Sequence, residues 1–119
     1  MAENIYEISM LLDFYGQLLT DSQYKCMDMY YNQDLSLAEI AEELEISRQG
    51  AHDFIKRGRA ALNEYESKLG LLERFCEIEK NLRLMQEDIQ LIDRSDMSSG
   101  NIYMLDQIEK NLLGIITKL

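Results

Sequence analysis

The segment from Ser36 to Arg59, SLAEIAEELEISRQGAHDFIKRGR, constrains the fold more than any other part of the chain. Ser36 and Glu39 have the spacing of a capping box, in which each side chain bonds the backbone N–H of the other at a helix start. The apolar residues that follow recur at helical spacing, at Leu37, Ile40, Ala41 and Leu44. Ser47 offers a second N-cap shortly afterwards. Two short helices joined by so tight a turn predict a helix-turn-helix.

The turn between the two helices contains one apolar residue, Ile46, which we expect to fill the corner. Ala41 lies where the helices should approach most closely, so its small side chain favours a close crossing. At about 100° per residue, the second helix has an apolar face that we expect to lie in the core. That face holds Ala51, Phe54, Ile55, Gly58, Ala61, Leu62 and Tyr65.

The opposite face of the second helix carries polar and basic side chains that could meet nucleic acid. In a helix-turn-helix the first residues of the second helix meet base edges and later cations meet phosphates. Arg and Gln can pair bidentately with guanine and adenine, respectively. We therefore predict that Arg48, Gln49 and His52 meet bases and that Lys56, Arg57 and Arg59 meet phosphates, with Arg48 and Arg57 on the flanks of this face. Ser47 is included among the predicted DNA-binding residues. Asp53 opposes this prediction, because it repels phosphate unless it accepts from a cytosine amino group.

Two other interpretations of the same helix stay open. A charged outer face is typical of any soluble amphipathic helix. Some helix-turn-helix domains only hold proteins together, so the fold does not by itself establish DNA binding.

Charge is distributed unevenly in a chain whose formal net charge is −10. Residues before Ser47 carry one basic and ten acidic side chains, and residues 69–119 carry six basic and nine acidic ones. Residues 47–68 carry five basic and three acidic side chains and form the one net-positive stretch. This favours a nucleic-acid role for the second helix, while the acidic remainder opposes non-specific binding. A single copy should bind DNA weakly.

Composition indicates an all-α protein. The 119 residues contain no proline and six glycines, and no alternating run is long enough for a strand.

Cys26 and Cys76 are each isolated on helical patterns, so we expect two reduced core cysteines. One histidine and no paired cysteines give no metal site, and nothing indicates a cofactor or a catalytic constellation. With no signal peptide and no membrane span in the sequence, we expect a cytoplasmic, non-enzymatic protein.

A four-helix body ending near Gly70 is expected to form the DNA-binding domain, residues 1–70. The first helix should cover Ile5 to Leu19, with its inner face formed by Ile5, Ile8, Leu11, Leu12, Tyr15, Leu18 and Leu19. Thr20 and Gln23 have capping-box spacing for a second helix. Its large side chains are expected in the core and are Tyr24, Met27, Tyr30 and Tyr31.

Residues 71–119 are expected to form an antiparallel helical hairpin. Their first part has alternating apolar spacings of four and three, the period of a coiled coil, at Leu71, Phe75, Ile78, Leu82, Met85, Ile89 and Ile92. Asp93 to Gly100 is polar and turn-rich, and a last helix should follow from about Asn101. The two apolar faces could pack only on each other and the body. We favour the alternative, that they also join a second copy into a homodimer.

The run LLTDSQYKCMDMYYNQDLSLAEIAEELEISRQGAHDFIKR resembles the YlxM-type family of small bacterial helix-turn-helix proteins. The segments that carry the resemblance are Leu18-Leu19-Thr20, Tyr30-Tyr31, SLAEIAEE, Ile46 to Gln49, Ile55-Lys56-Arg57 and Tyr65 to Leu69. The resemblance implies a fold similar to region four of bacterial sigma factors. It also implies a non-enzymatic regulator linked to the signal recognition particle pathway, because such genes neighbour those of its targeting GTPases.

The chain departs from the family pattern at Glu45, where helix-turn-helix proteins usually have glycine, and at Gly50 and His52. Gly50 and Gly58 lie inside the second helix, each costing roughly 1 kcal/mol relative to alanine. We therefore weigh two functions. One is a DNA-binding regulator acting as a homodimer, and the other is a protein or RNA adaptor that contacts signal recognition particle components.

Overall fold

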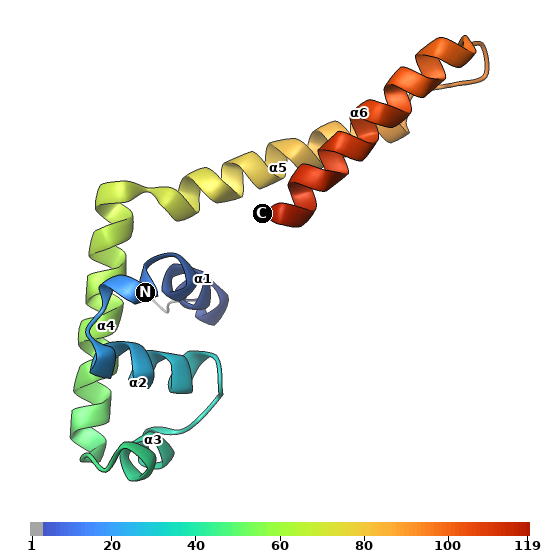
Figure 1. Ribbon diagram of the computed structural model, residues 1–119. Coiled ribbons are helices and arrows are strands. Elements are labelled where there is room, and N and C mark those ends of the chain that lie inside the picture. The colour runs from blue at the N-terminus through green and yellow to red at the C-terminus, as the bar shows by residue number, and fades with distance from the viewer. Residues whose placement is uncertain (1–3) are drawn as a thin grey trace. The chain divides into compact units, whose positions relative to one another are not determined.

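The computed structural model describes residues 4–119 and is all-α over that range, without a strand. Its elements are helices α1 (Ile5–Tyr15), α2 (Asp21–Tyr31), α3 (Leu37–Leu44), α4 (Arg48–Leu69), α5 (Leu71–Gln90) and α6 (Ser99–Lys118), with a short 3-10 helix at Gly16–Leu18 (Figure 1). The chain divides into two compact units, Met1–Leu72 and Glu73–Leu119. The first unit contains α1 to α4, which confirms the four-helix body and the all-α class.

The first helix is shorter than the sequence predicts. The α-helix stops at Tyr15, the 3-10 turn follows, and Leu19 is extended. Leu19 must leave the helix because Thr20 starts α2 as an N-cap, with its side chain accepting from the N–H of Gln23. The expected inner face is therefore wrong at its two ends, since the side chains of Ile5 and Leu18 are more than half exposed.

The second helix begins at the predicted capping box, and its predicted core is confirmed at Met27 and Cys26 but wrong at Tyr24 and Tyr30. Thr20 and Gln23 cap each other's N–H as expected. Met27 and Cys26 are fully buried, whereas Tyr24 and Tyr30 are exposed. Large size alone suggested a stripe of tyrosines in the core. The helix instead turns its thioether and thiol inward, and burial raises the pKa of the Cys26 thiol.

Close packing of α2 against α4 depends on Gly58. A Cβ placed on this residue would lie 2.8 Å from Sδ and 2.9 Å from Cγ of the buried Met27. The glycine that weakens α4 as a helix former thus lets Met27 pack against its backbone. The buried core of this unit is Ile8, Leu11, Leu12, Tyr15, Cys26, Met27, Ile40, Ala41, Ala51, Ile55, Leu62 and Leu72.

The junction between α4 and α5 is held by polar contacts from α1. Helix α4 ends where Gly70 adopts a left-handed conformation, with φ 62°. The hydroxyl of Tyr15 accepts from the N–H of Leu71, and Oε1 of Glu66 accepts from the N–H of Leu72. These two bonds satisfy N–H groups at the start of α5 that have no partner inside a helix.

The second unit is a hairpin of α5 and α6, joined by residues 91–98. Helix α6 begins two residues earlier than predicted because Ser98 is its N-cap and accepts from the N–H of Asn101. Ile89, Leu105 and Leu112 form its buried cluster, and the partly buried side chains around them are Leu82, Met97 and Ile116. The prediction of a buried Cys76 is wrong, because this thiol lies on an exposed face of α5.

Residues 4–119 contain neither a candidate membrane span nor a candidate metal site. No helix there has the length and apolarity needed to cross a membrane. Within the same described range, histidine, cysteine and carboxylate side chains do not gather into a group that could hold a metal ion.

Candidate nucleic-acid interface

The helix-turn-helix predicted from the sequence is present as α3, a tight turn and α4. Ser36 and Glu39 form the predicted capping box, with bonds of 3.1 Å in both directions. The carboxylate that accepts from the Ser36 N–H is thereby stabilised, which lowers the pKa of Glu39. Helix α3 therefore begins where the sequence places it and fixes the start of the turn that follows.

The turn is a Schellman-type helix end built on Glu45. Glu45 has φ 57° and ψ 43°, a left-handed conformation that ordinarily favours glycine. The N–H of Ile46 donates to the carbonyl of Ala41 at 3.0 Å, and the N–H of Glu45 donates to that of Glu42 at 3.3 Å. The turn thus has the backbone geometry that usually requires glycine, although Glu45 carries a side chain. Ile46 lies half-buried at the corner.

Ser47 then starts α4, as predicted, and its hydroxyl accepts from the N–H of Gly50 at 2.9 Å. Gly50 suits this position because a Cβ there would lie only 3.0 Å from the same hydroxyl oxygen. Ser47 is therefore occupied as a cap. Its role in the expected interface is to set the direction in which the first turn of α4 points.

Three of the predicted base-reading residues come together at one open hollow. Arg48, Gln49 and His52 line it from α4, and Leu37 lines it from the start of α3. All three α4 side chains are exposed. A hollow rimmed by a guanidinium, an amide and an imidazole offers donors and acceptors that suit base edges in a major groove.

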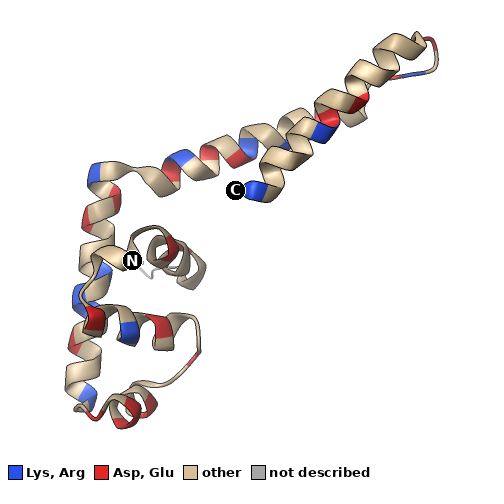
Figure 2. Cartoon of the chain, viewed as in Figure 1, with Lys and Arg blue, Asp and Glu red and all other residues tan. Residues whose placement is uncertain are grey.

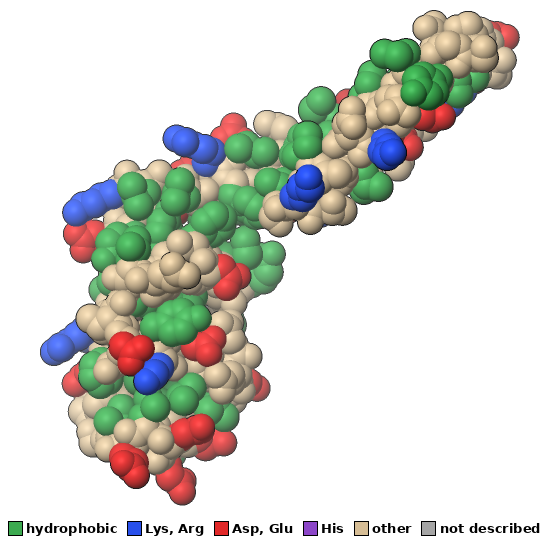
Figure 3. Space-filling model, in the orientation of Figure 1, with side chains coloured by type: hydrophobic (Ala, Val, Ile, Leu, Met, Phe, Trp, Pro, Cys, Tyr) green, Lys and Arg blue, Asp and Glu red, His purple; other side chains and the backbone are tan. Residues whose placement is uncertain are grey.

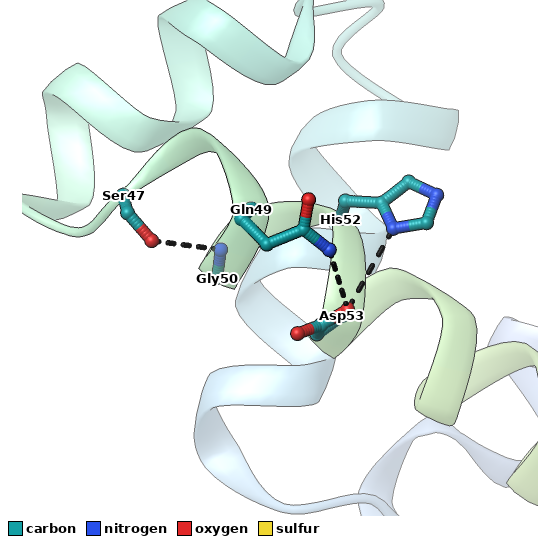
Figure 4. Close-up of polar contacts among 5 residues, drawn as sticks. All are labelled: Ser47, Gln49, Gly50, His52 and Asp53. Carbon is teal, nitrogen blue, oxygen red and sulfur yellow. Dashed lines mark hydrogen bonds and ion pairs between the residues drawn. The ribbon is translucent and has the colours of Figure 1, made fainter.

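Asp53 lies close to two of these side chains (Figure 4). Nε2 of Gln49 donates to Oδ1 of Asp53 at 3.1 Å, and Nδ1 of His52 lies 3.7 Å from the same oxygen. The carboxylate therefore does not project freely from the helix. It accepts a hydrogen bond from the Gln49 amide, while its distance from the His52 ring is too long for a hydrogen bond. This role of Asp53 is not among those predicted from the sequence, although Gln49 and Asp53 are one helical turn apart.

The predicted phosphate-contacting residues do not share one side of the helix. Lys56 lies one turn beyond His52 and is exposed. Arg59 is half-buried, and its guanidinium donates to the hydroxyl of Tyr31 at 3.3 Å. Arg57 is exposed but lies about 140° around α4 from His52. Lys56 and Arg59 thus continue the side that carries the hollow, while Arg57 points elsewhere.

Helix α3 exposes acidic side chains. Glu39, Glu42 and Glu43 are all exposed there, whereas the cations of this unit are concentrated along α4 (Figure 2). Phosphate could approach α4 favourably only from the side away from α3, because like charges repel. The structure therefore narrows any nucleic-acid interface to the α4 side of the hollow.

The comparisons with known proteins agree on one family. Residues 2–99 match the model of the family UPF0122, described as "Putative helix-turn-helix protein, YlxM / p13 like". A UPF0122 protein of Acetivibrio thermocellus is 46% identical over 114 residues, covering 96% of this chain and 97% of that protein. One from Clostridium kluyveri is 47% identical over 116 residues, covering 98% and 100%. One from Clostridium perfringens is 42% identical over 110 residues, covering 91% and 96%.

Proposed function

Because the chain belongs to the UPF0122 family of YlxM/p13-like helix-turn-helix proteins, we propose that it is a DNA-binding regulatory protein that reads a duplex with α4. The observation that carries this proposal is the hollow at the start of α4, where Arg48, Gln49 and His52 are exposed together. Residues at this place in a helix-turn-helix meet base edges in the major groove.

Electrostatics adds support for the same helix. Residues 47–68 form the one net-positive stretch of a chain whose net charge is −10. Lys56 and Arg59 lie on the side of α4 that continues from the hollow, so they could meet the phosphates beside a base that Arg48 or Gln49 contacts. The acidic remainder should keep non-specific affinity low.

The proposal is tested with the doubly substituted variant Arg48→Ala/Lys56→Ala. Both side chains are exposed, so the fold should survive their loss. We expect duplex affinity in a fluorescence anisotropy titration to fall at least tenfold, because one base contact and one phosphate contact are lost. Equal affinity of variant and wild type, with unchanged circular dichroism, would count against the proposal.

A matched control separates this effect from loss of charge alone. The variant Lys80→Ala/Lys110→Ala removes two exposed cations from α5 and α6 and changes the net charge by the same amount. Its duplex affinity should stay close to that of the wild type. A loss as large as that of the α4 variant would show that net charge, not the α4 surface, controls binding.

The finer parts of the proposal concern the cellular role. The family resemblance links such a regulator to the signal recognition particle pathway, and we propose that this protein acts in that pathway. The alternative is an adaptor that contacts protein or RNA of the targeting machinery without reading DNA. The exposed carboxylates of α3 favour an adaptor that contacts protein, because they repel the phosphates of DNA and RNA alike and suit a basic protein surface. Absence of duplex binding at low salt would shift the assignment to this adaptor.

A further inference from the structure

The apolar heptad pattern of α5 divides into two sets in the structure. Leu82 and Ile89 pack in the hairpin cluster with α6, and Phe75 is half-buried one heptad earlier. The other set remains exposed at Ile78, Met85 and Ile92, with 44%, 52% and 45% of the side chain accessible. Each exposed residue follows an inward one by three positions, so half of the predicted coiled-coil seam has no partner within the hairpin.

Helix α6 repeats this division. Leu105, Leu112 and Ile116 face α5 in the hairpin cluster. Three positions after each of them come Ile108, Ile115 and Leu119, which are 49%, 50% and 45% exposed. A step of three residues turns about 60° backwards around a helix. Because α5 and α6 run antiparallel, this equal turn carries the exposed residues inside the helices, Ile78 and Met85 in α5 and Ile108 and Ile115 in α6, to the same side of the hairpin. Ile92 and Leu119 lie just beyond the ends of α5 and α6.

These six residues, Ile78, Met85, Ile92, Ile108, Ile115 and Leu119, are called here the hairpin strip. Hydrophobic side chains are spaced along both helices of this unit in Figure 3. With about half of each large side chain exposed, the strip offers on the order of 500 Å² of apolar surface, the size of the largest apolar patch on a typical monomer, which is often functional. The opposite side of the hairpin carries an ionic cluster, in which Arg94 pairs with Asp106 and Glu109, beside the exposed Leu113.

We propose that the hairpin strip is the surface through which two copies of this chain associate into a four-helix bundle. Ile78, Met85 and Ile92, like Ile108 and Ile115, are seven residues apart. A strict seven-residue repeat is matched by helices that carry the same repeat, since both must supercoil together. A second hairpin carries this repeat over the same length, and a two-fold axis brings the same strip of both copies together.

The chemistry of the strip also selects this occupant. The six residues are uncharged, so two strips meet without like-charge repulsion, and they offer no cation to a nucleic acid. Residues 73–119 carry nine acidic and six basic side chains, which disfavours an anionic membrane surface. The strip's apolar area, on the order of 500 Å², is more than half of the roughly 800 Å² that each partner contributes to a standard interface. The association would supply the second copy that the proposed DNA-binding function calls for.

The test uses the full chain, without DNA, in sedimentation velocity experiments from about 1 to 100 µM, because dimerisation depends on concentration. We expect a dimer for the wild type and a monomer for Ile115→Glu. Leu113→Glu is the matched control, since Leu113 is 49% exposed against 50% for Ile115 but lies on the opposite flank of α6. The control should remain a dimer.

Three results would overturn the inference. They are a wild type that is monomeric throughout, an Ile115→Glu variant that stays dimeric, and equal dissociation of both variants. Circular dichroism checks that each variant is folded. If Ile115→Glu does not fold, Ile115→Ala and Leu113→Ala replace the pair, and only the first should weaken the dimer, by about tenfold. A dimer that does not bind DNA would contradict the proposed function alone. A monomer that binds DNA would contradict this inference alone.

Discussion

The hydroxyl of Tyr15 donates a 2.6 Å hydrogen bond to Oε1 of Glu66, linking α1 to the last turn of α4 across 51 residues of sequence. The same hydroxyl accepts from the N–H of Leu71, and the same carboxylate accepts from the N–H of Leu72. Tyr15 is 1% exposed. This network therefore fixes, from inside the first unit, the place where α4 ends and α5 begins.

Replacing Tyr15 by Phe should destabilise the first unit while keeping the ring in place. The variant loses a hydrogen bond to a carboxylate and leaves the Leu71 N–H without its acceptor. We expect the free energy of unfolding to fall by about 1–2 kcal/mol in urea titrations followed by circular dichroism. A change below the experimental error would show that the hydroxyl does not stabilise the junction.

The Tyr15 variant should also change the response to alkaline pH. Burial, and next the hydrogen bond to Glu66, raise the pKa of Tyr15 above its ordinary value. An unfolded tyrosine ionises near about pH 10. The stabilising effect is therefore complete below that pH and is lost as pH rises through the folded pKa. The difference in unfolding free energy between wild type and Tyr15→Phe should shrink between neutral and alkaline pH; a constant difference would contradict this linkage.

Glu45→Gly should stabilise the protein. A side chain in the left-handed conformation costs roughly 1–2 kcal/mol, and glycine removes this cost. Part of the gain is lost, because glycine has greater conformational freedom in the unfolded chain. A net gain of about 0.5–1 kcal/mol in the free energy of unfolding is expected. Glu45→Ala keeps the Cβ and serves as the control, which should show no comparable gain. If both variants gain equally, the charge of Glu45 and not its backbone conformation is responsible.

Gly58→Ala and Gly114→Ala should act in opposite directions. Both glycines lie inside long helices, so alanine improves helix propensity by about 1 kcal/mol at each. At Gly58 the new methyl group would meet buried Met27, and overpacking of this kind costs about 1–3 kcal/mol. At Gly114 it meets no atom within 4 Å. Thermal unfolding should therefore shift down for the first variant and up for the second, and an upward shift for Gly58→Ala would refute the close-packing argument.

Asp53→Asn should strengthen duplex binding. The substitution removes a negative charge beside the proposed interface and keeps an oxygen that can accept from the Gln49 amide. Removing one such repulsion is worth about 1 kcal/mol near a surface, or about fivefold in affinity at low salt. Glu64→Gln is the control, because it makes the same charge change on α4 at a carboxylate paired with Lys68. Tightening by the control alone would contradict the placement of the interface at Asp53.

Local signals in the sequence predicted the helix starts well. Ser36, Thr20 and Ser47 are N-caps as expected, because a cap depends on residues only three positions apart. The turn at Glu45 was harder, since the preferred residue there is glycine and the chain tolerates a left-handed glutamate. Burial of individual side chains was least predictable. Tyr24 and Tyr30 look like core residues but are exposed. The reason is that the packing of α2 against α4 is set by the contact between Met27 and Gly58, two residues that lie far apart in the sequence.

The candidate site was predictable as a set of residues but not as an arrangement. The sequence placed Gln49 and His52 on one helix face with Arg48 on its flank, and the structure brings all three to one hollow. The bond from Gln49 to Asp53 depends on side-chain rotamers, and that from Arg59 to Tyr31 on the packing of two helices. In the hairpin, the heptad spacing could not tell which half faces α6. The structure shows that Leu82 and Ile89 are packed there, so making them polar would disrupt the hairpin itself.

The salt dependence of duplex binding, compared between the wild type and Lys56→Ala, shows whether α4 contacts phosphates. In anisotropy titrations with random duplex DNA, the logarithm of the association constant should fall linearly with that of salt concentration. Each neutralised phosphate contributes a slope of about −0.9. We predict sub-micromolar binding at low salt and a slope about one unit shallower for the variant. Absence of binding at low salt, or identical slopes for the two proteins, would contradict the assignment of α4 as a DNA-binding helix.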